Sequence, residues 1–463
     1  MTRSRMALGR IGSAVVAAAL LLGASVAPCS AEFEGNPVIF VHGGFGSAGQ
    51  FESQAMRFSS NGYPDSHLAA LEYDSLFGLQ SMDDVLSGLD DLIAELQAST
   101  GAAQVDLMGH SLGTAVSQMY LSTPERAASV AHYVNIDGGE ADAPPGGVET
   151  LAIWAGTGRP GRRIVGAQNV TIPNQTHVES ATSAESFAAM YRFLTGKNPA
   201  TIDIVRERGP IEISGRAVLF PQNEGVDGAT VDVWEVYSFN GERRGGAPAA
   251  TFAIGADGAF GPFHGIAGRS YEFVISRPDS DRTHRLYFEP FFRSSHFVRL
   301  LTAEPGGAID SLIERSDRHM ALTIVRYKEL WGDQGDESDR LEIDGTNVLN
   351  EATSPQSNRT NGLFVFDAGS DGVTDLSAPI STIAGLPFLS GADLFIPAEI
   401  PARGRLLVRV VPRGDTLAAR RVVVPRTAST VSAITIHLND FETPPTPRSG
   451  RPLRVAVKRQ DEP

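Results

Sequence analysis

The sequence has almost no cysteine: its 463 residues contain one, Cys29, near the N-terminus. Residues 1–31 have the pattern of a secretory signal, with three early arginines, an uncharged apolar run over residues 11–26 and a small-residue cleavage site ending at Ala31. Cleavage there removes Cys29, so the mature chain forms no disulfide and offers neither a cysteine nucleophile nor a thiolate metal site. We therefore expect a secreted protein, extracellular or periplasmic.

The sequence also lacks an apolar run of the length that spans a membrane. A spanning helix needs about 20 apolar residues, whereas the run over residues 11–26 is shorter and is followed by Pro28. A lipid anchor is the weaker alternative, because Pro28 occupies the place of the small residue that usually precedes a lipid-modified cysteine. We expect no integral membrane segment in the mature chain.

Positive charge is scarce relative to negative charge. The chain has 39 lysines and arginines against 54 aspartates and glutamates, which gives a formal net charge of -15. This balance argues against nucleic acid and anionic membrane surfaces as partners. A dispersed negative surface is ordinary for an exported protein, so the charge leaves protein partners open.

The chain is too long for one hydrophobic core, and its pattern changes once along the way. Up to residue 194, apolar β-branched runs alternate with helical periodicities, whereas beyond residue 202 short alternating strands are separated by glycine-containing turns. The first part predicts a minimal α/β domain with a mostly parallel sheet, and the second predicts all-β, sandwich-like domains. The expected boundaries are 1–31 for the signal peptide, 32–198 for the α/β domain, 202–300 and 301–443 for two β-rich domains, and 444–463 for a flexible tail.

One pentapeptide in the α/β part has the form of a nucleophile turn. Residues 105–108 predict a strand, the sequence GHSLG follows over residues 109–113, and residues 114–121 predict a helix. A serine at such a turn is held out from the sheet, and the flanking glycines let strand and helix approach closely. In a chain with 48 glycines the pentapeptide alone is weak, so the prediction of Ser111 as nucleophile depends on this setting.

A serine nucleophile needs a base, since a free hydroxyl is weakly nucleophilic at neutral pH. Downstream within the α/β part the histidines are His132 and His177. His132 lies in the strand pattern of residues 131–136, whereas His177 follows the last predicted strand at 170–172. A capping-box pattern at residues 182–185 opens the last predicted helix. His177, in the loop between that strand and that helix, is therefore the expected base.

The acid is chosen by elimination. It lies between nucleophile and base in the Ser, acid, His order of such folds, and residues 150–178 contain neither Asp nor Glu. Asp137 ends the strand predicted over residues 133–136, at the carboxyl edge where open α/β sheets place their sites. Asp137 is the first choice, and Glu140 and Asp142 are the alternatives.

A second glycine-rich turn follows the first predicted strand. Residues 38–41 are apolar and run into HGGFG over residues 42–46, where glycines permit a sharp turn with exposed backbone N–H groups. We expect the N–H groups of Gly44 and Leu112 to stabilise an oxyanion. Phe45 is the fallback for the second donor, and otherwise its ring lines the acyl site. A phosphate cradle is disfavoured because no Lys-Ser or Lys-Thr pair follows the glycines.

These motifs carry a resemblance. Residues 37–194 resemble small prokaryotic lipases and carboxylesterases of the α/β-hydrolase fold, through HGG at 42–44, the GHSLG turn, Asp137 and His177. The resemblance implies a Ser-His-Asp triad, an acyl-enzyme intermediate and a lipid or other ester substrate, with no metal and no organic cofactor.

The whole chain is similar to a less common group of lipases in which a minimal hydrolase domain precedes β-rich domains that help bind long acyl chains. Residues 211–275 also resemble carboxypeptidase regulatory-like or transthyretin-like β modules. The connection over residues 138–147 is short, which leaves little room for a lid.

Two further patterns have more than one interpretation. Phe288, Phe291 and Phe292 either line a substrate site, as the resemblance suggests, or pack in a β-domain core, the more common role of aromatics. The acidic groups at residues 333–339 and 367–375 match no established calcium loop, so a solvated surface is expected there.

Two functions from different classes are compatible with the sequence. The first is a secreted serine carboxylic ester hydrolase acting on acylglycerols or other fatty esters. The alternative is a polymer-surface binding protein or polyester depolymerase in which the β domains dominate. Under the first function, deletion of the chain beyond residue 201 is expected to harm long-chain hydrolysis most.

Overall fold

The computed structural model describes residues 33, 35–278, 280–399, 404–414 and 419–442. The expected signal peptide and the expected tail at 444–463 lie outside these residues. In the described part of the chain, no helix combines the length and apolar character needed to cross a bilayer.

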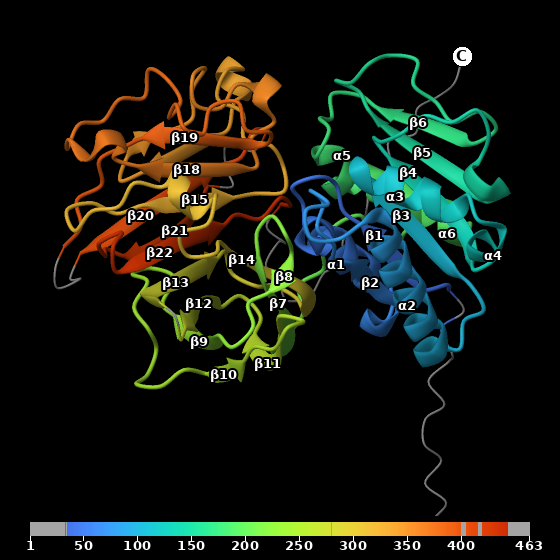
Figure 1. The fold of residues 1–463 in the computed structure, drawn as a ribbon, viewed down its shortest axis with the longest axis horizontal. Coiled ribbons are helices and arrows are strands. Elements are labelled where there is room, and N and C mark those ends of the chain that lie inside the picture. The colour runs from blue at the N-terminus through green and yellow to red at the C-terminus, as the bar shows by residue number, and fades with distance from the viewer. Residues whose placement is uncertain (1–32, 34, 279, 400–403, 415–418, 443–463) are drawn as a thin grey trace, which may run out of the picture. The chain divides into compact units, whose positions relative to one another are not determined.

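The N-terminal part is built on a six-stranded parallel sheet with the strand order β2-β1-β3-β4-β5-β6 (Figure 1). Its strands are β1 (Val38–Val41), β2 (Leu68–Leu71), β3 (Val105–His110), β4 (Val130–Ile136), β5 (Glu149–Ala155) and β6 (Gln168–Ile172). Its helices are α1 (Glu52–Ser60), α2 (Met82–Thr100), α3 (Leu112–Leu121), α4 (Pro124–Ala127), α5 (Glu179–Thr182) and α6 (Ala184–Thr195). The expected parallel α/β sheet is confirmed.

Alternate residues of β1 pack on different helices, which explains why the whole strand is apolar. Ile39 and Val41 share a buried cluster with the apolar stripes of α2 and α3. Phe40 points the other way, stacks on Phe51 at 4.8 Å between ring centroids, and contacts the tilted ring of Phe58 of α1 at 6.2 Å. The sheet is therefore covered on both faces, and its site is left at the carboxyl ends of the strands.

Two details of the N-terminal part differ from the sequence prediction. The elements β2 and α1 were not predicted, because their short apolar stretches carry no clear period. The last helix is capped by Ser183, whose hydroxyl accepts the N–H of Ser186. Thr182, the expected cap, instead ends the separate short helix α5, which directly follows the loop of His177.

The rest of the chain is made of strands. They are β7 (Pro210–Leu219), β8 (Glu224–Gly225), β9 (Thr230–Val236), β10 (Ala250–Ala253), β11 (Ala259–Ile266), β12 (Ser270–Arg277), β13 (Ser280–Phe288), β14 (Ser295–Thr302), β15 (Leu322–Val325), β16 (Arg340–Ile343), β17 (Thr346–Asn347), β18 (Gly362–Phe366), β19 (Leu389–Asp393), β20 (Arg405–Val411), β21 (Arg420–Pro425) and β22 (Ser432–His437). The strands expected around residues 213–218, 363–366, 405–411 and 431–437 are confirmed.

One eight-stranded sheet extends through both predicted β-rich domains, in the order β10-β9-β12-β13-β22-β15-β18-β19. The junction is the parallel pair β13 and β22, whose residues are about 150 positions apart in the sequence. The strand β14 crosses the predicted boundary at residue 300 and pairs with β7 in a second sheet. A hydrogen-bonded strand therefore passes through the predicted boundary between residues 300 and 301.

The β-rich part contacts the α/β part through β14. Phe297 meets Phe40 at 5.9 Å between ring centroids, and Arg299 forms a buried ion pair with Glu72. The hydroxyl of Ser295 donates to Glu52 of α1 at 2.7 Å.

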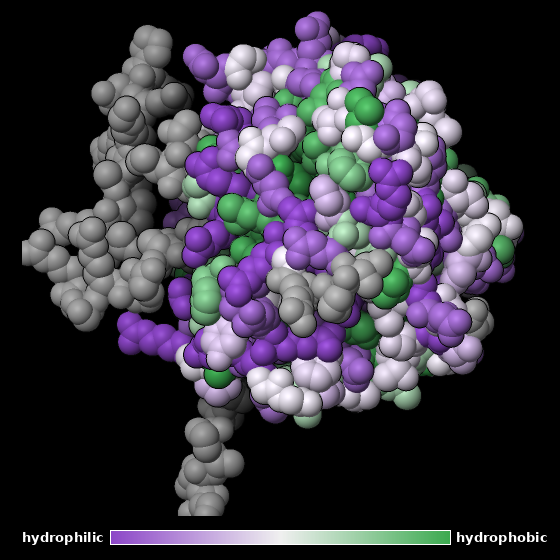
Figure 2. All heavy atoms as spheres, turned by 90° about the vertical axis from the view of Figure 1, so that its left-hand side faces the viewer, coloured by the Kyte–Doolittle hydropathy of each residue, from purple (hydrophilic) through white to green (hydrophobic). Residues whose placement is uncertain are grey.

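On the face of the molecule that Figure 2 shows, hydrophobic side chains lie in small groups among hydrophilic ones.

Burial at the β14 contact raises the pKa of Glu52 to about 7. In the unfolded chain this carboxyl ionises near pH 4.5, whereas in the folded chain it keeps its proton up to about pH 7. Ionisation of Glu52 is therefore easier in the unfolded chain than in the folded one. As a result, Glu52 does not reduce the free energy of unfolding below pH 4.5 but reduces it increasingly as the pH rises from 4.5 to 7.

We predict that Glu52→Gln, which keeps a neutral side chain of the same shape, raises the melting temperature by a few degrees at pH 8 and leaves it unchanged at pH 4.5. Calorimetry of both proteins at the two pH values measures this. Glu125→Gln, at an exposed position of α4, is the control and is expected to have no pH-dependent effect. An equal gain at both pH values would contradict the explanation.

Candidate active site

Ser111 lies at the turn between β3 and α3, in a backbone conformation that residues other than glycine rarely adopt, with φ 53° and ψ -119°. Space explains the flanking glycines. A Cβ on Gly109 would lie 2.5 Å from the carbonyl oxygen of Gly113, and a Cβ on Gly113 would lie 2.2 Å from that of Val41. Backbone atoms occupy both positions, so only glycine fits, and Ser111 is held out at the carboxyl edge of the sheet.

Three side chains from three different loops meet at this edge. The hydroxyl of Ser111 is 2.9 Å from Nε2 of His177, and Nδ1 of His177 is 2.6 Å from Oδ2 of Asp137. In this arrangement the N–H at Nδ1 donates to Asp137, which leaves Nε2 free to accept from the serine hydroxyl. The structure thus brings together the three residues that the sequence analysis selected.

Asp137 is held by more than His177. Its Oδ1 accepts from the backbone N–H of Ala155 at 2.9 Å and from Arg162 at 2.7 Å. Burial alone raises the pKa of Asp137, but the hydrogen bonds from His177 and Ala155, with the charges of His177 and Arg162, outweigh it and keep the pKa below its ordinary value. The carboxyl is therefore ionised at neutral pH and fixes the orientation of the imidazole.

The alternatives considered for acid and base lie elsewhere. Glu140 forms an exposed ion pair with Arg159, and Asp142 is exposed. His132 lies on β4 and bonds to Asp106 at 2.8 Å, which raises the pKa of His132. The hydrogen bonds of Glu140 and His132 thus go to residues outside the group of Ser111, His177 and Asp137.

The expected oxyanion donors flank the serine. Leu112 is the first residue of α3, and a Cβ on Gly44 would be 3.8 Å from the Leu112 side chain, so the two turns are adjacent. The N–H of Phe45 donates to the hydroxyl of Ser75 at 3.0 Å. This bond occupies the fallback donor, which favours Gly44.

The sequence analysis missed a hydrogen-bonded chain behind the base. Nε2 of His110 donates to the backbone carbonyl of His177 at 2.9 Å, and the amide of Gln50 donates to Nδ1 of His110 at 3.0 Å. The side-chain oxygen Oε1 of Gln50 in turn accepts from the backbone N–H of Gly43 at 3.4 Å. Burial lowers the pKa of His110, so the ring stays neutral and serves as both donor and acceptor. His110 stands inside the GHSLG motif, yet nothing in the sequence indicates its partners.

Residues of the β-rich part hold the turn after β1. The side chain of Asn223 donates to the carbonyl oxygens of Gly46 at 2.8 Å and of Tyr73 at 3.1 Å. The hydroxyl of Tyr327 is 3.0 Å from that of Ser47. The β-rich part therefore contacts the loops of the active site directly.

A cavity of about 1330 Å³, which includes its open mouth, starts beside Ser111 and His177 and extends along one face of the eight-stranded sheet. Three phenylalanines lie near its start: Phe45, Phe220 and Phe388. The ring of Phe388 stacks on that of His177 at 6.2 Å between centroids. The cavity floor is formed by cross-strand neighbours from five strands, namely His284, Ala433, Thr435, Thr323, Val325, Phe364, Gly362 and Leu389.

The opposite face of the same strands, which includes Leu322, Ile324 and Ile434, packs into a hydrophobic core. The alternation of a strand thus separates a cavity face from a core face. In the described residues no group of three or more His, Cys, Asp or Glu is arranged to hold a metal ion.

The structure corrects the substrate-binding assignment of three phenylalanines. Phe288 and Phe291 are buried in the core between the sheets of the first β-rich unit, and Phe292 packs under Arg206. None of the three lines the cavity, because Phe288 and Phe291 pack on Phe273 in the core and Phe292 is covered by Arg206. The acidic stretch at 333–339 is also not entirely a solvated surface, since Asp339 is fully buried beside Arg326.

Three family models match successive parts of the chain. Residues 35–125 match the class 2 lipase model, residues 209–305 match the lipase C-terminal domain model, and residues 308–442 match a further C-terminal domain model. No curated protein sequence matches the chain.

Three solved structures illustrate the structural comparison. Lipase B of Aspergillus fumigatus is 15% identical over 36% of this chain and 54% of its own, with a TM-score of 0.30. Bacillus licheniformis lipase BlEst2 in propeptide form is 11% identical over 85% of this chain and 93% of its own, with a TM-score of 0.29. A predicted CIB-like hydrolase from Thermoplasma acidophilum is 17% identical over 35% and 87%, with a TM-score of 0.28.

The fold defines an α/β hydrolase domain followed by all-β, sandwich-like domains. With the class 2 lipase match at its start and the lipase C-terminal domain match beyond it, the protein is a hydrolase of the lipase and esterase type.

We predict that Arg162→Gln raises the pKa of Asp137, because it removes a cation that stabilises the carboxylate. The carboxyl carbon of Asp137 should then titrate at a higher pH than in the parent protein. The NMR signal of this carbon between pH 2 and 5 measures the change. Arg159→Gln, in the same loop but paired with Glu140, is the control, and an identical profile for all three proteins would refute the role of Arg162.

Proposed function

We propose that the protein is a serine carboxylic ester hydrolase in which Ser111, His177 and Asp137 form the catalytic triad. The observation that carries the proposal is the pair of hydrogen bonds made by one imidazole, to the serine hydroxyl on one side and to an ionised, buried carboxylate on the other. If the glycine-rich turn at Ser111 had only a structural role, there would be no reason for both Ser111 and Asp137 to lie at hydrogen-bonding distance from His177.

The proposed reaction has two half-reactions. In the first, Ser111 attacks the ester carbonyl as His177 takes its proton, and the same proton then passes to the departing alcohol as the acyl-enzyme forms. In the second, water loses a proton to His177 and attacks the acyl-enzyme, and the same proton then passes to the oxygen of Ser111 as its bond to the acyl group breaks and the acid is released. The N–H groups of Gly44 and Leu112 stabilise both tetrahedral intermediates, each donor contributing about 3 kcal/mol.

We propose a fatty acyl ester as substrate. The cavity begins at the reacting serine, is bordered there by Phe45, Phe220 and Phe388, and continues along the sheet past Val325 and Phe364. A deep, mainly apolar cavity suits one extended acyl chain. An acylglycerol meets this requirement directly. A polyester depolymerase, the alternative, requires instead a surface that accepts a polymer on both sides of the scissile bond.

We also propose that the protein acts outside the cytoplasm, on the basis of residues 1–31. N-terminal sequencing of protein recovered from the medium or periplasm tests this proposal, and a chain that still starts at Met1 would overturn it.

The first test concerns the nucleophile. We predict that a fluorophosphonate labels the protein and inhibits ester hydrolysis, and that Ser111→Ala abolishes labelling and lowers kcat by at least about 1000-fold. Ser117→Ala, in the same helix and away from the cavity, is the control. Labelling that persists in Ser111→Ala would reject the proposed nucleophile.

The second test concerns the acyl chain. Ala433 is partly exposed on the cavity floor, so we predict that Ala433→Trp narrows the cavity and lowers kcat/KM for p-nitrophenyl palmitate by about tenfold or more, while hydrolysis of the acetate stays within about twofold. Ala433→Ser is the control and should resemble the parent protein. An equal loss for both esters would show that the cavity does not hold the chain.

The contacts also revise one expectation. Deletion of the β-rich part removes Asn223 and Tyr327 from the turn after β1, so we now expect deletion to reduce hydrolysis at every chain length. Point substitutions on the cavity floor therefore test chain binding more cleanly than truncation.

A further inference from the structure

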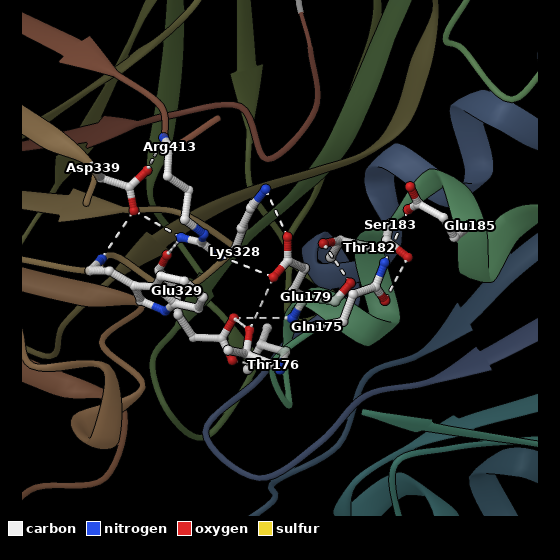
Figure 3. A network of polar contacts seen from close by, with 12 residues as sticks. Gln175, Thr176, Glu179, Thr182, Ser183, Glu185, Lys328, Glu329, Asp339 and Arg413 are labelled. Carbon is white, nitrogen blue, oxygen red and sulfur yellow. Dashed lines mark hydrogen bonds and ion pairs between the residues drawn. The ribbon is translucent and has the colours of Figure 1, made fainter. Parts of the chain in front are cut away.

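The loop that carries His177 is held by a carboxylate from the β-rich part (Figure 3). Glu329 is fully buried, and its Oε1 accepts from the N–H of Val178 at 2.7 Å. Its Oε2 accepts from the N–H of Glu179 at 3.1 Å and from the hydroxyl of Thr176. One donor therefore comes from the residue before His177 and two come from the two residues after it, and both carboxyl oxygens are used.

The two N–H groups lie where α5 begins. Glu179 is the first residue of this helix, and Val178 is its N-cap, whose own side chain makes no cap hydrogen bond. The first N–H groups of a helix have no partner within the helix. Glu329 supplies that partner from about 150 residues away in the sequence.

Glu329 is itself fixed by a buried ionic cluster. The guanidinium of Arg326 binds Asp339 through two hydrogen bonds, at 2.9 and 2.8 Å, and also donates to the backbone carbonyl of Glu329. Arg413 binds Asp339 at 2.8 Å and lies 3.8 Å from the ring centroid of Trp331. The backbone at Glu329 therefore has little freedom to move.

A second group of ion pairs joins the same two segments nearer to solvent. Glu179 binds Lys328 at 2.8 Å and Arg413 at 3.1 Å. These pairs hold α5 against the β-rich part but use the side chain of Glu179, and they do not contact the N–H groups of the His177 loop. The ion pairs of Glu179 thus join the α/β part to the β-rich part, whereas the hydrogen bonds of Glu329 fix the backbone of the His177 loop.

The other side of His177 is held within the hydrolase domain. Its carbonyl oxygen accepts from His110 at 2.9 Å and from the hydroxyl of Ser180 at 2.8 Å. The bonds to His110 and Ser180 restrain the residue itself, whereas Glu329 restrains both neighbours. With the backbone fixed in this way, the imidazole stays between Ser111 and Asp137.

We propose that Glu329 is a positioning residue of the active site: the second β-rich unit inserts this carboxylate beneath the His177 loop and thereby keeps the base within hydrogen-bonding distance of Ser111. The inference rests on the proposed function, since it assigns Glu329 a role through His177. It concerns the reacting centre and is independent of how the acyl chain is bound.

Loss of Glu329 leaves the N–H groups of Val178 and Glu179 without their acceptor, and the loop is expected to shift until water or another acceptor satisfies them. A displacement of the base by about 1 Å is sufficient to cost on the order of 100-fold in rate. Because the substrate does not contact Glu329, the effect should fall on kcat and leave KM nearly unchanged.

The experiment compares Glu329→Ala, Glu329→Gln and Lys328→Met in the full chain. Glu329→Gln keeps the acceptor for Val178, whereas Glu329→Ala keeps none. Lys328→Met removes an ion pair across the same contact without touching the loop N–H groups. Kinetics with p-nitrophenyl acetate and palmitate give kcat and KM, and the low-field NMR signal of the proton between His177 and Asp137 reports the geometry of the base.

We expect Glu329→Ala to lower kcat by about 10- to 100-fold for both esters with little change in KM, to broaden or shift the low-field signal, and to retain the far-ultraviolet circular dichroism of the parent. Glu329→Gln should recover a large part of kcat, and Lys328→Met should stay within about twofold of the parent. Unchanged kcat and an unchanged signal in Glu329→Ala would overturn the inference, as would an equal loss in Lys328→Met.

A failure of the proposed function is distinguishable. It would appear as a parent protein that neither hydrolyses esters nor reacts with a fluorophosphonate, and the low-field signal of the variants would still decide whether Glu329 positions His177. If Glu329→Ala does not fold, Glu329→Met takes its place, because Met has about the length of Glu but offers no oxygen to the N–H groups of Val178 and Glu179. Full kcat with an unshifted signal in Glu329→Met would overturn the inference.

Discussion

The active site depends on the orientation of one imidazole, because His177 has to meet Ser111 and Asp137 at the same time. These three residues follow β6, β3 and β4, and the parallel sheet brings the carboxyl ends of those strands to one edge. A sheet edge fixes where loops start but not how their side chains point. The hydrogen bonds around His177, from His110, Ser180 and Glu329, supply this second requirement.

The β-rich part supplies several of the contacts that shape the active site. Asn223 bonds to the turn after β1, Phe388 stacks on the imidazole, and the eight-stranded sheet forms the cavity floor. One face of that sheet packs as a core and the other lines the cavity. The hydrolase domain and the β-rich units thus build one site, and stability of their contact becomes a condition for its geometry.

The contact contains buried charges, which carry a cost unless each is paired. Arg326 and Asp339 are both almost fully buried and form an ion pair, and removing one member of such a pair commonly costs about 3 to 5 kcal/mol, since its partner is left uncompensated. The pairs with Arg326 and Arg413 hold the pKa of Asp339 well below its ordinary value, against the effect of burial. Arg326 and Arg413, which pair with Asp339, also donate to the backbone carbonyl of Glu329 and so restrain the residue that contacts the His177 loop.

The sequence by itself determined the elements whose signals are local. The all-apolar strand at 38–41, the stripe of α2, the GHSLG turn and the order of Ser111, Asp137 and His177 depend on neighbouring residues, and the structure has these elements and brings the three residues together. Tertiary structure decided the rest. Asp339 belongs to an acidic stretch expected in solvent, yet Arg413, 74 residues away, makes it a buried partner; Phe288 and Phe291 were expected to be able to meet substrate, yet the sandwich buries them. Glu329 shows the reason most directly, because its partners lie about 150 residues away, and no local pattern encodes a hydrogen bond that only the assembled fold makes possible.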